Sequence, residues 1–174
     1  ILMSMFYAFK ASGFWSEERE SNLLDGAAHF YDTYECSDKK FLAIGSIEPQ
    51  FYSILLDKLE IEDSRFLDQH NKKLWPELKI IIAAKIKTKT RDEWADIFDG
   101  TDACVAPVLS LSEAPEHHHM KARNSFVEVD GVVQPAPAPR FSNTITQIKH
   151  SSVKVGENND EICSKFNLDR SCFS

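Results

Sequence analysis

The chain is poor in the features that most simply identify a function. Its four cysteines form no Cys-x-x-Cys pair, and four thiols in 174 residues do not indicate a disulfide-stapled miniprotein, so we expect reduced, intracellular thiols. Neither a Gly-x-Ser-x-Gly elbow, a Walker loop nor a Gly-x-Gly-x-x-Gly segment occurs. The sequence therefore lacks the commonest motifs for nucleophilic catalysis and nucleotide binding.

Long apolar runs and basic blocks are missing as well. The longest apolar stretches, residues 1–9 and 78–86, are too short or too interrupted by lysine to cross a bilayer, so we expect a soluble chain with no membrane span. There are 20 Lys and Arg against 27 Asp and Glu, which gives a formal charge of −7. Because no basic block offers a phosphate backbone a footprint, nucleic acid is not an expected partner.

Three consecutive histidines, His117 to His119, follow Glu116 and suggest a metal site at first sight. Adjacent residues on a helix or strand point in different directions, whereas zinc ligands are spaced so that their side chains converge. We therefore interpret the run as a solvated helix end and expect no metal site.

Hydrophobic periodicity predicts an α/β chain, in which a mixed sheet with hairpins is flanked by helices. One hairpin joins residues 28–36 to 41–47, and a second, turned by Asp130-Gly131, joins residues 126–129 to 132–134. A short strand is expected over residues 104–108. Helices are expected up to Gly13, over residues 49–59, 72–87, 90–99 and 112–121, and after Asn158.

Local signals support two of these helices. Thr90 and Glu93 have the spacing of a capping box, and Gly100 is placed to end the helix that follows. Asn158 and Glu161 have the same spacing, which predicts a capped helix near the C-terminus.

Glu48 is the most informative carboxylate, because it stands between an apolar strand and Pro49. A proline suits the first helical position and biases the residue before it toward extended backbone. Glu48 is thus expected at a defined corner, where side chains often do chemistry. An acid at this position also simply complements the helix dipole, and that alternative stays open.

Five segments carry a resemblance to a known family. They are Asn-Leu-Leu-Asp-Gly at 22–26, Phe-Tyr-Asp-Thr-Tyr at 30–34, Ala-Ile-Gly-Ser-Ile-Glu-Pro-Gln-Phe at 43–51, Asp-Ala-Cys-Val-Ala-Pro-Val at 102–108 and Pro-Ala-Pro-Arg-Phe-Ser at 137–142. In this order they resemble the C-terminal half of the α-methylacyl-CoA racemases, which are similar to the family III CoA transferases. The resemblance implies two α/β domains per subunit and an interlocked homodimer.

The resemblance also implies an organisation for the chain. Residues 1–26 would be a linker helix and connector, and residues 27–134 the small α/β domain. Residues 135–174, which open with a Pro-Ala run, would be a proline-rich linker and a C-terminal helix that returns to a large domain.

The activity implied is inversion of the 2-methyl centre of branched-chain acyl-CoA, by removal and return of the α-proton. On this resemblance Glu48 is a supporting residue that orients the histidine base, and Tyr31 and Ile47 lie near the acyl chain. The family's histidine and aspartate bases lie in upstream segments that are missing here, so the chain alone is expected to be inactive. His29 and Asp32 belong to the strand segment and are assigned no such role. No cofactor is implied beyond the CoA of the thioester.

Two alternatives stay open from the sequence. One is CoA transfer, although related transferases carry a glycine-rich loop where this chain has only Gly26. The other is a non-catalytic binding or dimerisation module, suggested by the missing bases and the apolar opening helix. Location in peroxisomes or mitochondria is implied by resemblance only, since the terminal Cys172-Phe173-Ser174 does not resemble a Ser-Lys-Leu signal.

Overall fold

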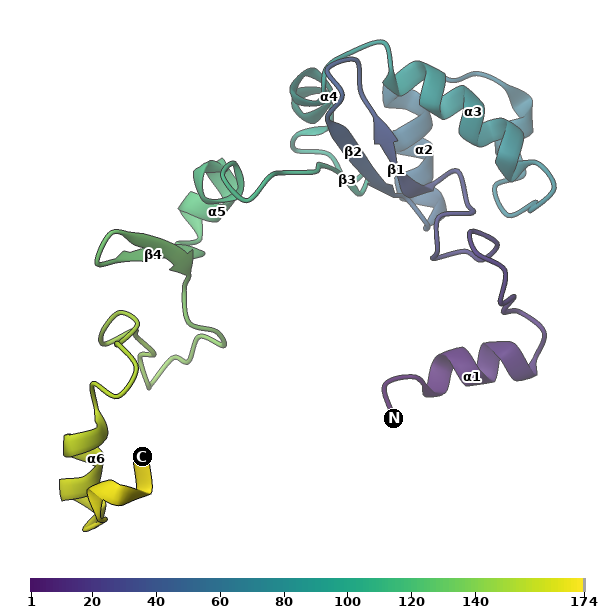
Figure 1. Cartoon of the computed structure of the whole chain (residues 1–174). Coiled ribbons are helices and arrows are strands. Elements are labelled where there is room, and N and C mark those ends of the chain that lie inside the picture. Colours follow the sequence, from purple (N-terminus) through teal and green to yellow (C-terminus); the bar gives the residue numbers. More distant parts are fainter. Residues whose placement is uncertain (174) are drawn as a thin grey trace. The chain divides into compact units, whose positions relative to one another are not determined.

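The computed structural model describes residues 1–173 and divides the chain into two compact units (Figure 1). The first unit is Ile1–Val108, and the second begins at Leu109. Ser174, on which the interpretation of the C-terminal signal partly rests, lies outside the described residues. The predicted division at residues 26 and 134 concerns the domains of a longer protein and stays a prediction.

The first unit is built on a three-stranded antiparallel sheet with the order β1-β2-β3. The strands are β1 (Tyr31–Glu35), β2 (Phe41–Gly45) and β3 (Val105–Pro107). The predicted hairpin of β1 and β2 is confirmed, with Thr33 opposite Ala43. The α/β class is also confirmed, but the strand pairs among the described residues are all antiparallel, so the sheets are not mixed.

Strand β1 begins three residues later than the sequence predicted. The amide of Tyr31 donates to the carbonyl oxygen of Ala28 at 3.0 Å, which folds this segment into a turn. Because Ala28 and Phe30 are fully buried, their apolar side chains supported a strand pattern although the backbone turns.

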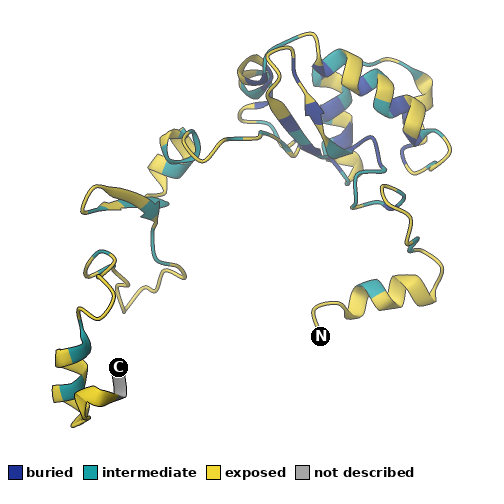
Figure 2. Ribbon diagram, in the orientation of Figure 1, coloured by how far each residue is buried: buried dark blue, intermediate teal, exposed yellow. Residues whose placement is uncertain are grey.

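Helices cover the inner face of this sheet and form the core with it. They are α2 (Pro49–Lys58), α3 (Trp75–Ile86) and α4 (Arg91–Phe98). Figure 2 shows the buried residues gathered where α2 and α3 meet β1 and β2. Leu42 and Ile44 of the sheet, Leu55 of α2 and Leu78 of α3 lie in one buried cluster. Ahead of it, α1 (Ser4–Ala11) has no buried residue.

Helix α4 has the start that its sequence predicts. The Thr90 hydroxyl accepts from the amide of Glu93, and the Glu93 carboxylate accepts from the amide of Thr90, so the capping box is formed. Further along, the indole of Trp94 donates to the carbonyl oxygen of Ile86 at 2.8 Å and ties α4 to the end of α3.

We predict that Thr90→Ala lowers the free energy of unfolding by about 1 kcal/mol, because it leaves the amide of Glu93 in the first turn of α4 without its acceptor. Urea unfolding of the full chain measures this loss. Thr88→Ala is the matched control, since its exposed hydroxyl donates only to the carbonyl of Lys85 and its loss should cost less than half as much. Equal losses in the two variants would contradict the capping role.

In the second unit, the predicted hairpin is confirmed as β4 (Phe126–Val129) and β5 (Val132–Pro135). Asp130 and Gly131 both have positive φ, 51° and 79°, as the two central residues of a type I′ turn require. The helix predicted over residues 112–121 is instead split into a 3₁₀ turn, Ala114–Glu116, and α5 (His118–Ala122). The split occurs because His117 is extended, with φ −62° and ψ 134°.

The terminal helix α6 (Asn159–Phe166) begins where predicted and is followed by a 3₁₀ turn, Arg170–Phe173. The predicted cap is wrong, because the Asn158 side chain makes no capping bond. Asn158 has φ −96° and ψ 2°, whereas a capping residue has extended backbone that turns its side chain toward the first amides.

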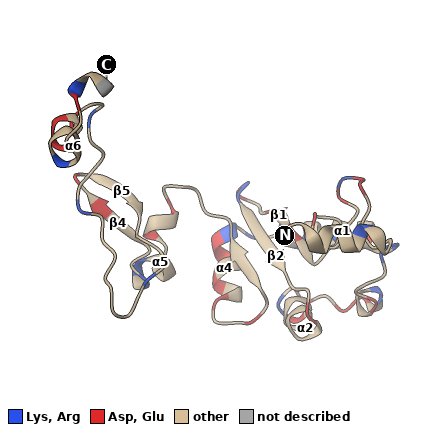
Figure 3. Ribbon diagram, turned by 90° about the horizontal axis from the view of Figure 1, so that it is seen from below, with Lys and Arg blue, Asp and Glu red and all other residues tan. Residues whose placement is uncertain are grey.

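Charge and length add two general observations. Figure 3 shows Lys and Arg spread over several elements, with acidic residues concentrated along α4.

Within residues 1–173, no helix combines the length and the apolar composition needed to cross a membrane.

Candidate functional site

The outer face of the three-stranded sheet carries a hollow of about 430 Å³. Strand residues alternate, so that Tyr34, Leu42 and Ile44 are buried in the core while their neighbours line the hollow. The lining side of β1 and β2 is formed by Tyr31, Thr33, Ala43 and Gly45, and Cys104 and Ala106 continue it beside β3. The hollow is also lined by Ile44 and by Asp25, Gly26 and Asp32, so two carboxylates belong to it.

Small residues give this hollow its floor. A methyl group added at Gly45 would lie 3.7 Å from both the carbonyl oxygen of Cys104 and the ring of Tyr31. The tyrosine ring therefore lies against the backbone of β2, and a larger side chain at Gly45 would occupy space next to it.

A turn held by several hydrogen bonds connects β2, which lines the hollow, to α2. The amide of Gly45 donates to Cys104 at 2.9 Å, and the amide of Ser46 donates to Phe30 at 3.0 Å. The Ser46 hydroxyl, which is fully buried, donates to the carbonyl oxygen of Ala103. These bonds join the turn to both neighbouring segments of the sheet.

A residue that the sequence did not single out closes this turn from the other side. The side-chain amide of Gln69 donates to the carbonyl oxygens of Ser46, at 3.1 Å, and Ile47, at 2.9 Å. Gln69 is 23 positions from Ser46 in the sequence, so no local pattern could have indicated the contact.

Glu48 follows this turn and lies at the start of α2. Its backbone is extended, with φ −74° and ψ 141°, and Pro49 occupies the first turn, as the sequence predicted. The side chain is exposed and makes no capping bond, although the Glu48 carbonyl accepts from the amide of Tyr52 at 2.9 Å. Within residues 1–173 the carboxylate has no hydrogen-bond partner, which leaves it available to a group from outside the unit.

Cys104 is a member of the site that the sequence analysis did not select. It is exposed, has a positive φ of 55° and lines the hollow. Burial raises the pKa of its thiol, and the carboxylates of Glu48 and Asp102 raise it further. The thiol is therefore protonated at neutral pH and is no nucleophile.

The two residues predicted to lie near an acyl chain have different positions. Tyr31 lines the hollow directly and is half-buried. Ile47 packs against the core cluster and does not line the hollow. Of the predicted site residues, Tyr31 lines the hollow, Ile47 packs partly inward, and Glu48 is exposed at the start of α2 and is not part of the lining.

His29 lies inside the core. It is fully buried, and its Nε2 is 2.7 Å from the hydroxyl of Tyr52, while its Nδ1 has no partner. Burial and, to a smaller extent, the nearby His70 lower the pKa of His29 from 6.5 to about 4. The imidazole is neutral at physiological pH, which fits a structural residue.

The tautomer of His29 follows from its surroundings. The Tyr52 hydroxyl is also 3.2 Å from the carbonyl oxygen of Phe66, to which it can only donate. If His29 carries its proton on Nε2, it donates to Tyr52 and Tyr52 donates to Phe66. This arrangement leaves only an acceptor at Nδ1 unpaired, whereas the other tautomer would bury an unpaired N–H group.

Asp32 is committed to an ion pair. One of its oxygens lies 2.5 Å from the amine of Lys79 on α3, and the other accepts from the amide of Thr33 at 2.8 Å. Lys79 also donates to the carbonyl oxygen of Gly26. The carboxylate therefore fastens β1 and the preceding loop to α3, which is consistent with assigning it no catalytic role.

We predict that burial of neutral His29 makes stability fall in mild acid. The unfolded chain binds the proton near pH 6.5 and the folded chain only near pH 4, so the contribution is complete above pH 6.5 and is lost as the pH falls toward 4. The loss reaches about 3 kcal/mol. Urea unfolding of His29→Phe against the parent chain should show a stability difference that changes by this amount.

His119→Phe is the control for this comparison, because His119 is exposed at the start of α5. Its pH dependence should match that of the unsubstituted chain. If His29→Phe also matched it, His29 would not be buried in the neutral form.

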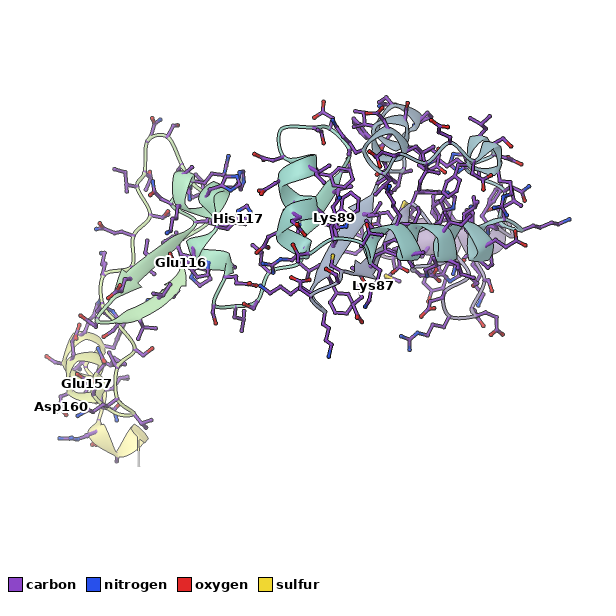
Figure 4. All side chains as sticks on the ribbon, turned by 90° about the horizontal axis from the view of Figure 1, so that it is seen from above. Lys87, Lys89, Glu116, His117, Glu157 and Asp160 are labelled. Carbon is purple, nitrogen blue, oxygen red and sulfur yellow. The ribbon has the colours of Figure 1, made fainter. Side chains whose placement is uncertain are left out.

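The histidine run of the second unit is arranged by stacking. The rings of His117 and His118 have centroids 4.4 Å apart, and Glu116, which precedes them, pairs with Lys121 at 2.6 Å (Figure 4). Within residues 1–173, no three potential metal ligands converge.

The sheet and its helices form a small α/β domain. The sequence profile of CoA-transferase family III matches residues 2–159, so the chain belongs to this family. Among solved structures, a CAIB/BAIF family protein from Brucella suis has the same fold, with a TM-score of 0.68, 20% identity and coverage of 95% of this chain and 44% of that chain. Rv3272 from Mycobacterium tuberculosis follows with a TM-score of 0.64 and 14% identity, covering 91% of this chain and 41% of that chain.

Closer in sequence are two proteins named alpha-methylacyl-CoA racemase. The mouse protein is 41% identical over 169 residues, and the human protein is 40% identical over 172 residues. The matches cover 95% and 97% of this chain. The chain spans slightly less than half the length of these relatives, at 44% and 45%.

Proposed function

We propose that the chain is the C-terminal portion of an acyl-CoA racemase that inverts the 2-methyl centre of branched-chain acyl-CoA thioesters. The observation that carries the proposal is Glu48, an exposed carboxylate that has no partner within residues 1–173 and stands at the start of the helix that follows β2, one of the strands that line the hollow. Identity and coverage favour a racemase: identity is 40–41% with the two racemases over 95–97% of this chain, 36% with a CoA-transferase family protein from Caenorhabditis elegans over 68% of it, and 23% with an acyl-CoA transferase from Fusarium pseudograminearum.

The proposed chemistry requires two proton-transfer groups on opposite faces of the α-carbon. One removes the proton next to the thioester carbonyl, the resulting enolate is stabilised, and the other group returns a proton. In the proposal, a histidine and an aspartate from a part of the parent protein outside this chain are the two bases. The Glu48 carboxylate accepts a hydrogen bond from the histidine, which fixes its tautomer and raises its basicity.

The hollow suits the apolar part of such a substrate. Its floor of glycine and alanine is smooth, and Tyr31 adds an aromatic wall with a hydroxyl at its end. In the proposal, the branched acyl chain lies on Tyr31 and approaches Ile47, which would become part of the pocket once the substrate and the rest of the parent cover the turn.

The parent is proposed to act as an interlocked homodimer in peroxisomes or mitochondria. Because the α-carbon leaves the reaction with the oxidation state it had at the start, the proposed reaction needs no redox cofactor. CoA takes part only as the carrier in the thioester.

CoA transfer is the second candidate function. A CaiB/baiF CoA-transferase family protein from Caenorhabditis elegans is 36% identical over 118 residues, which cover 68% of this chain. The loop before β1 argues against CoA transfer, because it holds the single glycine Gly26 where related transferases carry a glycine-rich loop. A side chain at Gly26 would approach Asp32 to 3.4 Å. A third candidate is a binding module without activity, and the exposed apolar residues of α1 favour it.

We predict that the 174-residue chain alone does not exchange the α-proton, because one supporting carboxylate cannot act as two opposed bases. Incubation with 2-methylacyl-CoA in heavy water, followed by mass spectrometry of the α-position, measures this. The parent protein, assayed in parallel, should incorporate deuterium. It should form no new thioester when a free acid is added, whereas a transferase would form one.

We predict that Glu48→Gln in the parent lowers turnover about 10- to 100-fold, the usual loss for a partner that orients a catalytic histidine. The variant keeps the shape and removes the charge, so the fold should survive, as circular dichroism can show. Glu62→Gln is the matched control, since Glu62 is an exposed carboxylate after the end of the same helix. If both variants turned over like the parent, Glu48 would be only a helix-terminus acid.

A further inference from the structure

The turn that carries Glu48 is held by one buried amide side chain. Gln69 is 7% exposed and lies just after the 3₁₀ turn Ser64–Leu67. Its side-chain nitrogen donates to the carbonyl oxygens of Ser46 and Ile47, at 3.1 and 2.9 Å. Because these two residues directly precede Glu48, we propose that Gln69 is a positioning residue for the Glu48 carboxylate, an inference that rests on the proposed racemase function.

The chemistry of the contact fixes the orientation of the amide. The Gln69 nitrogen has two hydrogens, and each has one carbonyl oxygen to meet. The flipped amide would place its own oxygen against two other oxygens, so the side chain has a single satisfactory orientation. A glutamine is therefore specifically suited to this position, where a carboxylate or an aliphatic side chain would leave both carbonyl groups unpaired.

Gln69 is itself anchored to the core. Its backbone carbonyl accepts from the indole nitrogen of Trp75 at 2.8 Å, and Trp75 is buried at the start of α3. A chain of contacts thus runs from the start of α3 through Gln69 to the turn. The position of this turn relative to the core is set by these side chains as well as by the β-ladder.

The consequence for Glu48 follows from its lack of contacts. Its side chain has no capping bond, so the direction of the carboxylate is set by the backbone that leads into it. The amide of Gln69 orients the peptide planes after Ser46 and Ile47, and the plane after Ile47 is the one that joins Glu48. Displacement of a catalytic group by about 1 Å can cost about 100-fold in rate, so a loosened turn should reduce turnover through Glu48.

The contact itself can be tested in the 174-residue chain by hydrogen exchange. Gln69→Met keeps the length of the side chain and removes both donors. The amide of Ile47, bonded to Gly45 at 2.9 Å, should then exchange at least about tenfold faster, while the amide of Trp94 in α4 keeps its rate. Gln50→Met, the same change on the exposed first turn of α2, should alter neither. An unchanged rate at Ile47 would overturn the proposal.

The coupling to Glu48 is tested in the parent protein by combining substitutions. If Gln69 acts through Glu48, Gln69→Met lowers turnover, but added to Glu48→Gln it causes little further loss. If Gln69 only supports the fold, the two losses multiply, and the proposal is wrong. Gln50→Met should leave turnover unchanged, alone or with Glu48→Gln.

The outcomes separate this inference from the function on which it rests. A parent without racemase activity, or one indifferent to Glu48→Gln, contradicts the proposed function, while the exchange rate of Ile47 still decides whether Gln69 holds the turn. Should Gln69→Met fail to fold, Trp75→Phe is the second variant, because it removes the indole donor to Gln69 and keeps an aromatic ring. It should raise exchange at Ile47 by a smaller factor, about threefold, and an unchanged rate would overturn the proposal.

Discussion

The hydrogen bonds of the buried Ser46 are the constraint on which the site depends. Its amide bonds to Phe30 before β1 and its hydroxyl to Ala103 before β3, so one residue joins three segments at the end of the sheet. A buried polar residue is stable only when its groups are paired, and here each pairing also fixes backbone. The sheet therefore ends at a defined place, and α2 begins four residues after the last residue of β2, with Glu48 between them.

Within the first unit, the polar side chains that stabilise the fold are not the one proposed to take part in chemistry. Histidine and aspartate side chains near β1 are already occupied, His29 by the aromatic core and Asp32 by Lys79. Their polar atoms stabilise the fold and are poorly placed to exchange protons with a ligand. The carboxylate that is left unpaired, Glu48, lies at the surface. Under the proposed function, in which both bases come from another part of the parent, this unit would contribute an oriented carboxylate and a surface for the acyl chain.

Local features of the structure could be predicted where neighbouring residues determine the backbone. Thr90 and Glu93 satisfy each other, Asp130-Gly131 adopts the φ values of a tight turn, and Pro49 starts a helix, because each of these effects acts within four residues. Asn158 had the right sequence spacing, but the backbone there does not turn its side chain toward the helix. The cap failed on a dihedral angle that the residue type does not determine.

The candidate site was only partly predictable for a different reason. Glu48 could be selected because a proline follows it, and Tyr31 because of a resemblance. Gln69 had no local signal, since its partners are more than 20 positions away and become neighbours only when the 3₁₀ turn folds back on the sheet. Cys104 has a positive φ, and its carbonyl oxygen lies near Gly45. The sequence around Cys104 did not indicate this backbone conformation.

The start of α2 lacks the capping hydrogen bond that another residue type could make there. Serine, threonine, aspartate or asparagine before a helix would pair a first-turn amide and add about 1 kcal/mol of stability, as Thr90 does for α4. Glu48 makes no such bond, although its backbone is extended as a cap requires. Its side chain is exposed, and Pro49 removes one of the amides that would need a partner. If the Glu48 carboxylate is to meet a group from another domain, it must be free of contacts within its own helix, and a residue that does not cap the helix meets this condition. The hydrogen-bonded turn before Glu48 supplies the order that a cap would otherwise give.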